Sequence, residues 1–267
     1  MKTAAAEKLS QAFEARAARA DLLAPGSPSA EGPLRFAAAL FRAQGRCAAA
    51  FAGLPLTGHL RDDAPRLFAA WEPLLAAIEK HGPPALSAEA RFRATQGREA
   101  LLAQLDGYWK AETFDFVARA LLRPYAAALD ALGIPPDRVA AVPRERGVLC
   151  PFCAGQPVVS ARRTPPESHG AARSLVCALC GRETPFARIR CPACEEADPN
   201  KLPSFQGEGN AAARIEACET CKRYVKSIDL TLDARPIPEV DDLLTIALDL
   251  WAVEQGYERV EPGLAGL

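Results

Sequence analysis

The first 145 residues carry apolar stripes with helical spacing, divided by short Pro/Gly breaks. The clearest stripe recurs at i, i+3, i+4 and i+7, which predicts a helix of about four turns with one apolar face. Its members are Leu67, Phe68, Trp71, Leu74, Leu75 and Ile78. A second stripe, over residues 116–122, is expected to end or kink near Pro124, because proline has no amide hydrogen to donate. With breaks such as Gly133, the pattern predicts about five helices packed as a bundle.

A separate helix is predicted after Pro236 and Pro238, which stop the preceding chain from continuing as a strand. Its apolar residues fall on one helical face, which we expect to pack back on a domain. They are Val240, Leu243, Leu244, Ala247 and Trp251. Three acidic residues, Asp241, Asp242 and Asp249, lie outside that face. The predicted helix is therefore acidic on its other side.

Eight of the nine cysteines lie between these helical segments, in four Cys-x-x-Cys pairs. The pairs are Cys150/Cys153, Cys177/Cys180, Cys191/Cys194 and Cys218/Cys221. The second two pairs repeat the first two at an offset of 41 residues, with 23 residues between the pairs of each half and 10 between the halves. Ala172-Arg173 likewise falls on Ala213-Arg214. Duplication of one ribbon unit explains this repeat.

The spacing of the cysteines favours two tetrahedral metal sites. Two residues between paired cysteines let one tight turn aim both sulfurs at one point, and two such turns supply the four soft ligands that zinc or iron takes. We expect a sequential grouping, in which each half of the repeat binds one ion. The two ligand sets are then Cys150, Cys153, Cys177 and Cys180, and Cys191, Cys194, Cys218 and Cys221. An interleaved grouping, first pair with third and second with fourth, remains open.

Disulfides and thioredoxin-like redox chemistry are disfavoured for these cysteines. Glu7 and Glu14 interrupt any apolar core of a signal peptide, so we expect a cytoplasmic chain whose thiols stay reduced. Prolines around the pairs, such as Pro157 and Pro185, do not offer the βαβ setting of a redox-active dithiol. Metal binding is the remaining interpretation.

Composition and charge limit the classes of partner that the protein is expected to bind. No apolar run reaches the ~18 residues of a membrane span. Residues 150–235 carry 12 basic and 10 acidic side chains, and two divalent ions with four thiolates each would turn this balance to about −2. Nucleic-acid binding normally needs a basic face, so we expect no nucleic-acid partner and no membrane partner. A small patch of Lys222, Arg223 and Lys226 keeps a ribbon-type nucleic-acid binder as an alternative.

Few residues are available for catalysis. Cys47 lies in an Ala-rich helix, where an isolated cysteine is expected to behave as a small buried hydrophobe. His59 and His81 border predicted loops, and His169 lies in the first 23-residue loop. With four cysteines present, we do not expect His169 to replace a thiolate ligand. We therefore expect no catalytic site and no enzyme activity.

The C-terminal part of the chain resembles a known family. Residues 218–229 (CETCKRYVKSID), followed by 241–245 (DDLLT) and 248–252 (LDLWA), are similar to the C-terminal signature of the FdhE-type formate dehydrogenase accessory proteins. Residues 150–160 and 116–122 resemble the same family, so the likeness covers roughly residues 112–257. The chain departs from the pattern at Thr184-Pro185, where the family has Trp-His.

The resemblance implies an assembly factor. Such a protein is cytoplasmic, has a helical N-terminal domain and two rubredoxin-like metal sites, is needed for active formate dehydrogenase, and binds the catalytic subunit of that enzyme. The resemblance also favours iron over zinc, which the cysteine spacing alone does not separate. Nothing in the sequence predicts the oligomeric state.

The expected fold class is α+β, with an N-terminal helical bundle, two tandem rubredoxin-like or zinc-ribbon metal sites, and a C-terminal helix. We expect a helical domain over 1–145, a first four-cysteine ribbon over 146–188, a second over 189–235, and a C-terminal helix and tail over 236–267. Such metal sites stiffen a small unit, because their folding depends on the ion.

Two roles of the metal sites stay open at this point. The ribbons and the acidic C-terminal helix are expected to form a docking face for an immature subunit, with both ions structural. If the ions are iron, a redox role stays open, in which Arg188 and Arg190 beside Cys191 tune the potential. A rubredoxin-like electron carrier is the alternative function in that case. Cys191 and Cys218 belong to the more signature-like ribbon, so we expect their replacement to harm function at least as much as replacement of Cys150 or Cys177.

Overall fold

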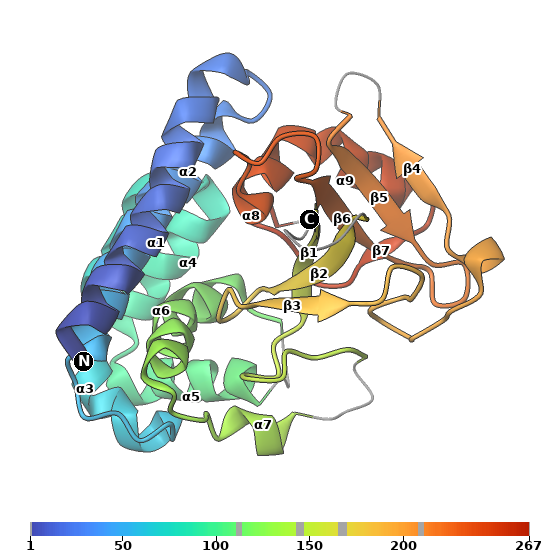
Figure 1. Ribbon diagram of the computed structural model, residues 1–267. Coiled ribbons are helices and arrows are strands. Elements are labelled where there is room, and N and C mark those ends of the chain that lie inside the picture. The colour runs from blue at the N-terminus through green and yellow to red at the C-terminus, as the bar shows by residue number, and fades with distance from the viewer. Residues whose placement is uncertain (1, 111–113, 143–146, 165–169, 208–210, 267) are drawn as a thin grey trace. The chain divides into compact units, whose positions relative to one another are not determined.

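A computed structural model of the chain describes residues 2–110, 114–142, 147–164, 170–207 and 211–266 (Figure 1). The chain forms two compact units. One comprises Met1–Gly26, Leu34–Pro143 and Pro151–Ala154, and the other Ser27–Pro33, Arg144–Cys150 and Gly155–Leu267. The first unit is helical and the second is built on a sheet. Within the described ranges, no helix has both the length and the apolarity needed to cross a bilayer.

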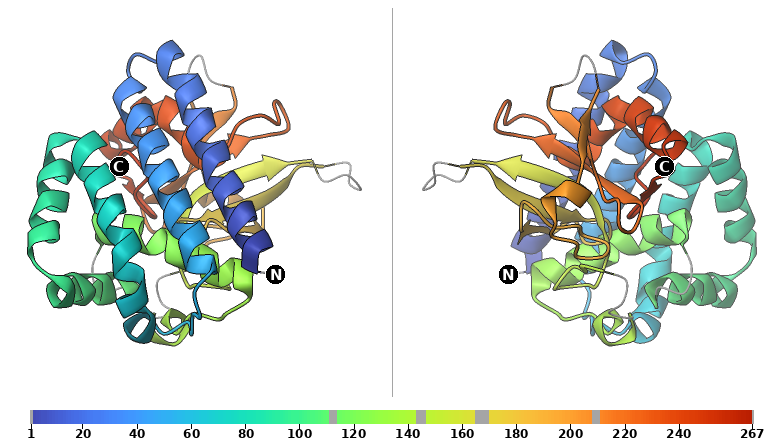
Figure 2. Two further views of the ribbon diagram at one scale, coloured as in Figure 1. Left: turned by 90° about the vertical axis from the view of Figure 1, so that its left-hand side faces the viewer. Right: turned by 90° about the vertical axis from the view of Figure 1, so that its right-hand side faces the viewer.

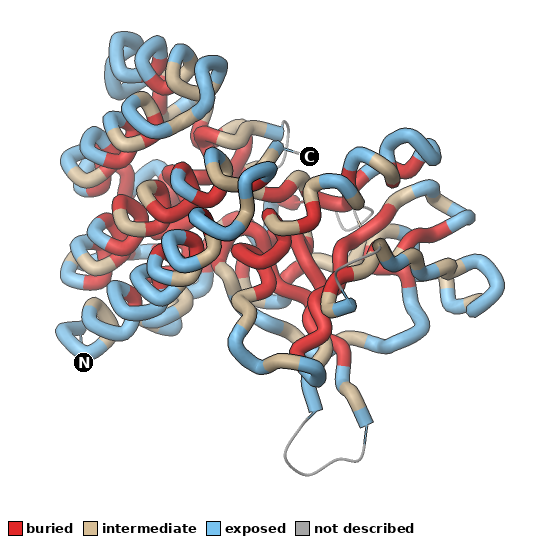
Figure 3. The backbone as a smooth tube through the Cα atoms, turned by 90° about the horizontal axis from the view of Figure 1, so that it is seen from above, coloured by how far each residue is buried: buried red, intermediate tan, exposed pale blue. Residues whose placement is uncertain are grey.

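The helical unit has more helices than the apolar pattern predicts. Its elements are α1 (Lys2–Leu23), η1 (Ala24–Gly26), α2 (Glu31–Ala52), α3 (Leu60–His81), α4 (Pro84–Thr95), α5 (Arg98–Trp109), α6 (Phe116–Leu132) and α7 (Arg138–Ala141). Helices α1 and α2 run antiparallel, side by side (Figures 1 and 2). Figure 3 shows buried and exposed stretches alternating along the helices, as one-sided packing requires. The bundle expected from the sequence is therefore present.

Helices α3 and α6 pack against each other in this bundle. The predicted stripe on α3 is confirmed, since Leu67, Trp71, Leu74 and Ile78 have no exposed surface. The indole nitrogen Nε1 of Trp71 donates a hydrogen bond to the carbonyl oxygen of Leu121 on α6, at 2.9 Å. A buried tryptophan thus keeps a partner for its one polar atom.

Helix α6 does not end at Pro124. It continues to Leu132, because the carbonyl that loses its partner to proline finds another one. Pro124 has no N–H for the carbonyl oxygen of Ala120, and the buried Gln44 side chain on α2 donates to that oxygen instead, at 2.8 Å. The helix ends at Gly133, whose φ of 69° is the left-handed conformation that glycine adopts readily.

The second unit consists of a sheet and short helices. Its strands are β1 (Pro157–Arg163), β2 (Ala172–Cys177), β3 (Glu183–Phe186), β4 (Ser204–Gln206), β5 (Ala213–Ala217), β6 (Arg223–Asp229) and β7 (Glu258–Arg259). Its helices are η3 (Pro199–Lys201), α8 (Pro238–Asp241), η4 (Asp242–Thr245) and α9 (Ile246–Glu254). Strand β5 starts 41 residues after β2, at the offset of the cysteine repeat.

The two halves of the repeat share one sheet, with the strand order β3-β2-β1-β6-β5-β4. Pairing is antiparallel within β1–β3 and within β4–β6. The halves join where β1 pairs with β6 in parallel, with Ser160 opposite Ser227, and β7 adds a second parallel partner to β6. The predicted ribbons are therefore continuous with one another.

The C-terminal helical segment buries a different set of side chains from the one that was predicted. It is divided into α8, η4 and α9, and Ala247, expected on the apolar face, is exposed. Asp241, Asp242 and Asp249 are at most 5% exposed, so the expected acidic docking face does not exist. The physical reason is a pair of buried cations that the sequence pattern does not reveal.

Two buried cations, Lys226 on β6 and Arg259 on β7, balance Asp242 and Asp249. The ammonium nitrogen Nζ of Lys226 lies 3.0 Å from Asp242 and 2.6 Å from Asp249, and the guanidinium of Arg259 lies 2.8 Å and 3.1 Å from the same carboxylates. The hydroxyl of Tyr224 also donates to Asp249, at 2.9 Å. This buried ionic network joins the C-terminal helices to the sheet, and all of its charges are paired.

The basic patch of Lys222, Arg223 and Lys226, the basis of the nucleic-acid-binding alternative, is not present in the fold. Lys226 has no exposed surface. Lys222 pairs with Glu219, and Arg223 lies 3.8 Å from Glu258. The three side chains therefore do not form one basic face.

Because of this network, the folded state is expected to become less stable at acid pH. Burial raises the pKa of the Asp242 carboxyl, but the charges of Arg259 and Lys226 outweigh burial and hold this pKa below its ordinary value. A lowered pKa in the folded state stabilises the fold above the unfolded value of about 4. That stabilisation is lost as the pH falls through the folded-state pKa.

We expect Lys226→Met to lower the free energy of unfolding by about 3–5 kcal/mol, because it leaves two buried carboxylates with one cation. Urea unfolding followed by circular dichroism measures the change. Lys222→Met is the matched control, since the Lys222 side chain is 57% exposed, and should stay near wild type. Equal stability of the two variants would contradict the structural role of the network.

Candidate metal centres

The four Cys-x-x-Cys segments form the same backbone turn. In each, the amide of the first cysteine donates to the carbonyl oxygen five residues later. The bonds are Cys150 to Gly155 (2.9 Å), Cys177 to Arg182 (2.9 Å), Cys191 to Glu196 (2.8 Å) and Cys218 to Arg223 (2.9 Å). The two-residue spacing thus produces one local geometry four times.

Each turn places the residue after the second cysteine in the left-handed region. These residues are Ala154 (φ 53°), Gly181 (φ 76°), Glu195 (φ 63°) and Lys222 (φ 55°). Among the non-glycine residues of the described ranges, only Ala154, Glu195 and Lys222 have positive φ. Non-glycine residues rarely adopt this conformation, and such strain clusters at functional sites. The backbone therefore identifies the four turns independently of the sulfurs.

The eight sulfurs gather into two groups of four, and within each group all lie within 4.8 Å of one another. The first group is Cys150, Cys153, Cys177 and Cys180, and the second is Cys191, Cys194, Cys218 and Cys221. The sequential grouping predicted from the spacing is confirmed, and the interleaved alternative is wrong. Loop length decides this, because each half closes on itself before the chain enters the other.

Distances between the sulfurs fit a tetrahedron around an ion. Cys150 and Cys180 are 3.7 Å apart, as are Cys191 and Cys221, and Cys194 and Cys218 are 3.6 Å apart. Metal–sulfur bonds of about 2.3 Å give a tetrahedron edge of about 3.8 Å. A disulfide would need about 2.05 Å. Both clusters can hold an ion, and four soft sulfurs suit zinc and iron alike.

Backbone amides support the sulfurs in both halves. The amide of Leu179 donates to the sulfur of Cys177 at 3.4 Å, and the amide of Ala193 donates to the sulfur of Cys191 at 3.3 Å. Such donors stabilise thiolate ligands and tune the potential of a bound iron. In both halves the donor is the amide two residues after the first cysteine of its pair.

The two clusters differ in exposure. Every cysteine of the first cluster is at most 9% exposed. In the second, Cys191 and Cys218 are buried, Cys194 is exposed and Cys221 is half-buried. Solvent and other molecules therefore reach the second cluster more easily than the first.

The chain that enters the first cluster lies against a turn of the second. The amide of Val148, two residues before Cys150, donates to the carbonyl oxygen of Pro192 at 2.8 Å. Gly147 has a φ of 93°, and a Cβ atom there would lie 2.4 Å from the carbonyl oxygen of Ala193. Only glycine fits this approach. The two clusters are thus joined by backbone contact as well as by the sheet.

The remaining cysteine and histidines take no part in the clusters, among the residues that the structure describes. Cys47 is buried on α2, and its thiol donates to the carbonyl oxygen of Ala70 at 2.9 Å, while burial raises its pKa to about 12. It is the buried, inert cysteine that we expected. His59 precedes α3 and His81 ends it, and His169 lies outside the described residues.

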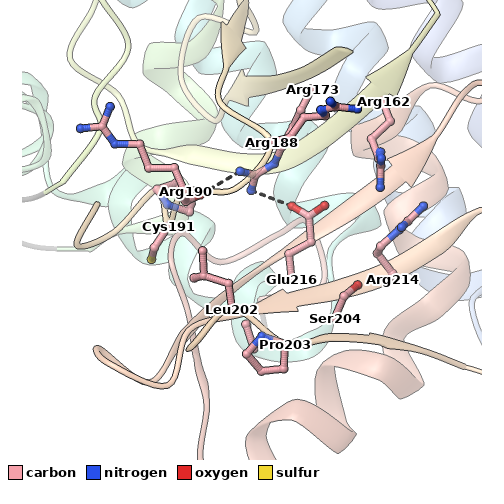
Figure 4. Close-up of a pocket in the computed structure, with 12 residues that line it drawn as sticks. Arg162, Arg173, Arg188, Arg190, Cys191, Leu202, Pro203, Ser204, Arg214 and Glu216 are labelled. Carbon is pink, nitrogen blue, oxygen red and sulfur yellow. Dashed lines mark hydrogen bonds and ion pairs between the residues drawn. The ribbon is translucent and has the colours of Figure 1, made fainter. Parts of the chain in front are cut away.

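More arginines lie beside Cys191 of the second cluster than the sequence pattern indicates. Arg188 and Arg190, expected beside Cys191, line one pocket with it (Figure 4). Arg162, Arg173 and Arg214 line the same pocket but were missed as site residues. The repeat carried a signal for two of them, because Arg173 and Arg214 occupy equivalent positions.

The part of the chain that contains the second cluster also matches a known protein family. Residues 189–265 match the family model described as FdhE, C-terminal domain. A protein named Protein FdhE homolog from Pseudomonas aeruginosa is 32% identical over 73% of this chain and 66% of its own length. One of the same name from Aquifex aeolicus is 28% identical over 73% of this chain and 68% of its own length. The chain thus spans about two thirds of these relatives.

A solved structure extends the likeness to the whole fold. The crystal structure of the FdhE protein from Pseudomonas aeruginosa superposes with a TM-score of 0.70 and 26% identity, and covers 94% of this chain and 94% of the other. The match therefore includes the helical unit, most of which lies outside residues 112–257, the range that carries the sequence resemblance.

We expect the second cluster to lose its ion to a chelator faster than the first, because Cys194 is exposed. Variants Cys153→Ser and Cys194→Ser each disable one cluster, so the surviving site can be followed by metal analysis during challenge with a chelator. The second site should release its ion at least about tenfold faster, in line with its exposed ligand. Cys47→Ala is the control and should keep two ions per chain. Equal release rates would contradict the difference in accessibility.

We also expect metal retention to fall as the pH falls. Burial raises the pKa of the Cys191 thiol to about 11, and metal binding must displace that proton. Release of at least one proton per ion weakens the affinity at least about tenfold per pH unit. Competition with a colorimetric chelator at several pH values measures this, with circular dichroism to exclude unfolding. An affinity independent of pH would show that the thiols are ionised without metal.

Proposed function

We propose, because this chain is an FdhE-type protein, that it is an accessory factor needed to form active formate dehydrogenase. The observation that carries the proposal is the match over 94% of a solved FdhE protein, together with the family domain that contains the second cluster. In this proposal the protein acts in the cytoplasm and catalyses no reaction of its own.

The eight paired cysteines are the proposed metal ligands. Each cluster binds one ion, with iron favoured by the family resemblance and zinc as the alternative. Folding coupled to such an ion gains on the order of 10 kcal/mol per site at neutral pH. The domain boundaries at residues 145, 188 and 235 belong to the same proposal. Two ions in one continuous sheet would make a stiff scaffold for binding.

The proposed binding surface for the catalytic subunit is the exposed side of the second cluster. Cys194 is exposed and Cys221 half-buried there, whereas Asp241, Asp242 and Asp249 of the C-terminal helices are buried. This surface therefore replaces the acidic helix as the docking site. It also accounts for our expectation that loss of Cys191 or Cys218 harms function at least as much as loss of Cys150 or Cys177.

A pull-down of a formate dehydrogenase catalytic subunit by the tagged chain tests this function. We expect wild type and Cys47→Ala to capture the subunit, and Cys191→Ser/Cys218→Ser to lose capture. Cys150→Ser/Cys177→Ser is the matched control for loss of a metal site as such, and should lose less. Absence of capture by metal-loaded wild type would overturn the proposal.

An electron carrier is the second candidate function. The amide of Ala193 donates to the sulfur of Cys191, and the cluster is open to solvent, as electron exchange with a partner requires. It predicts a red, iron-loaded protein that bleaches reversibly with cytosolic reductants. A colourless, zinc-loaded protein that is fully active in complementation would exclude it.

A further inference from the structure

A pocket of about 150 Å³ lies beside the second cluster, and arginines dominate its wall. The lining includes five arginines, one glutamate and Cys191, and these charged residues are Arg162, Arg173, Arg188, Arg190, Arg214 and Glu216. A single water needs about 10–15 Å³ of such space, so the pocket has room for a small polyatomic ion. Figure 4 shows Glu216 among the arginine side chains and Arg190 extending away from them.

The sheet explains why these charges converge. Arg162 on β1 lies opposite Arg173 on β2, and also opposite Asp229 on β6. Arg214 and Glu216 are two residues apart on β5, and therefore project on the same face of the sheet. The duplicated positions Arg173 and Arg214 thus meet in one pocket, because both halves contribute to one sheet.

Three of the five arginines have acidic partners. The pairs are Arg173 with Glu216 (2.6 Å), Arg214 with Asp229 (2.7 Å) and Arg190 with Glu195. Arg173 is also a structural residue, since it donates to the hydroxyl of Ser160 and to the carbonyl oxygen of Arg190. These three arginines hold the pocket together and contribute little net charge.

Two arginines lack such partners in the described part of the chain. The side chains of Arg162 and Arg188 make no hydrogen bond or ion pair there, and the Nε atom of Arg162 is buried without an acceptor. Arg162 acts on Asp229 only through its charge. A buried guanidinium nitrogen without an acceptor is costly, and an anion in the pocket would relieve it.

We propose that this pocket binds a phosphate-class dianion, with Arg162 and Arg188 as its main ligands. Two uncommitted guanidinium groups balance the charge of about −2 that a phosphate group carries near neutral pH. The planar fork of arginine matches the oxygens of phosphate and forms strong, charge-assisted hydrogen bonds. The pocket is a ligand site separate from the proposed metal ligands, apart from the wall that Cys191 provides, and it does not depend on the proposed accessory function.

Inorganic phosphate, titrated into the metal-loaded full chain in a phosphate-free buffer of low ionic strength, is the direct probe. Isothermal calorimetry should show one phosphate per chain. Acetate at the same concentrations tests the carboxylate class, and sodium chloride tests screening alone. Binding of acetate without binding of phosphate, or no binding of phosphate at all, would overturn the proposal.

Arg162→Gln/Arg188→Gln should weaken phosphate binding at least about tenfold, because it removes both charge-assisted partners. Arg188→Gln alone changes only an exposed side chain and should weaken binding several-fold without changing the fold, as checked by the melting temperature. Arg235→Gln, at an exposed arginine of the same unit, is the matched control and should bind as wild type does. Equal affinity of the Arg188→Gln variant and this control would contradict the proposed site. Because the readout is binding, it is independent of any effect on formate dehydrogenase.

Discussion

The structure of the cysteine-rich part of the chain depends on bringing four sulfurs close to one point, twice. This requirement fixes the turn at each cysteine pair, including three non-glycine residues at positive φ that would otherwise be unfavourable. The second and fourth turns connect β2 to β3 and β5 to β6, so these strands enter the sheet directly from the clusters. The sheet also has its own buried apolar clusters, one around Val159 and Ile228 and one around Ile215 and Tyr224.

The buried ionic network is the second constraint, and it decides what the C-terminal helices do. Asp242 and Asp249 face inward because Lys226 and Arg259 lie under them, so these carboxylates, expected on an exposed helix face, are part of the interior. Residues of the family-like signature, including Tyr224, Lys226 and Asp249, belong to this network. That part of the signature therefore has a structural reason: removing one member leaves a buried charge unpaired.

The two clusters have different surroundings although their ligand spacing is the same. The first is enclosed, whereas the second has an exposed cysteine and an arginine-lined pocket at Cys191. Duplication produced equivalent turns, but the sheet placed equivalent residues in different environments. Arg173 came to lie almost fully buried against Glu216, and Arg214 pairs with Asp229. Chemistry beyond metal binding is therefore expected at one cluster rather than at both.

The sequence by itself determined the features that depend on local spacing. The stripe around Trp71, the four turns at the cysteines, their sequential grouping and the family resemblance all follow from residues close together in the chain. Tertiary structure alone decided the rest, because it depends on partners far apart in sequence. Gln44 lets α6 pass Pro124, Lys226 turns Asp249 inward, and strands from both halves bring Arg162 and Arg214 to one pocket. A pattern along one segment shows which side chains share a face, but only the assembled fold determines which charges meet there.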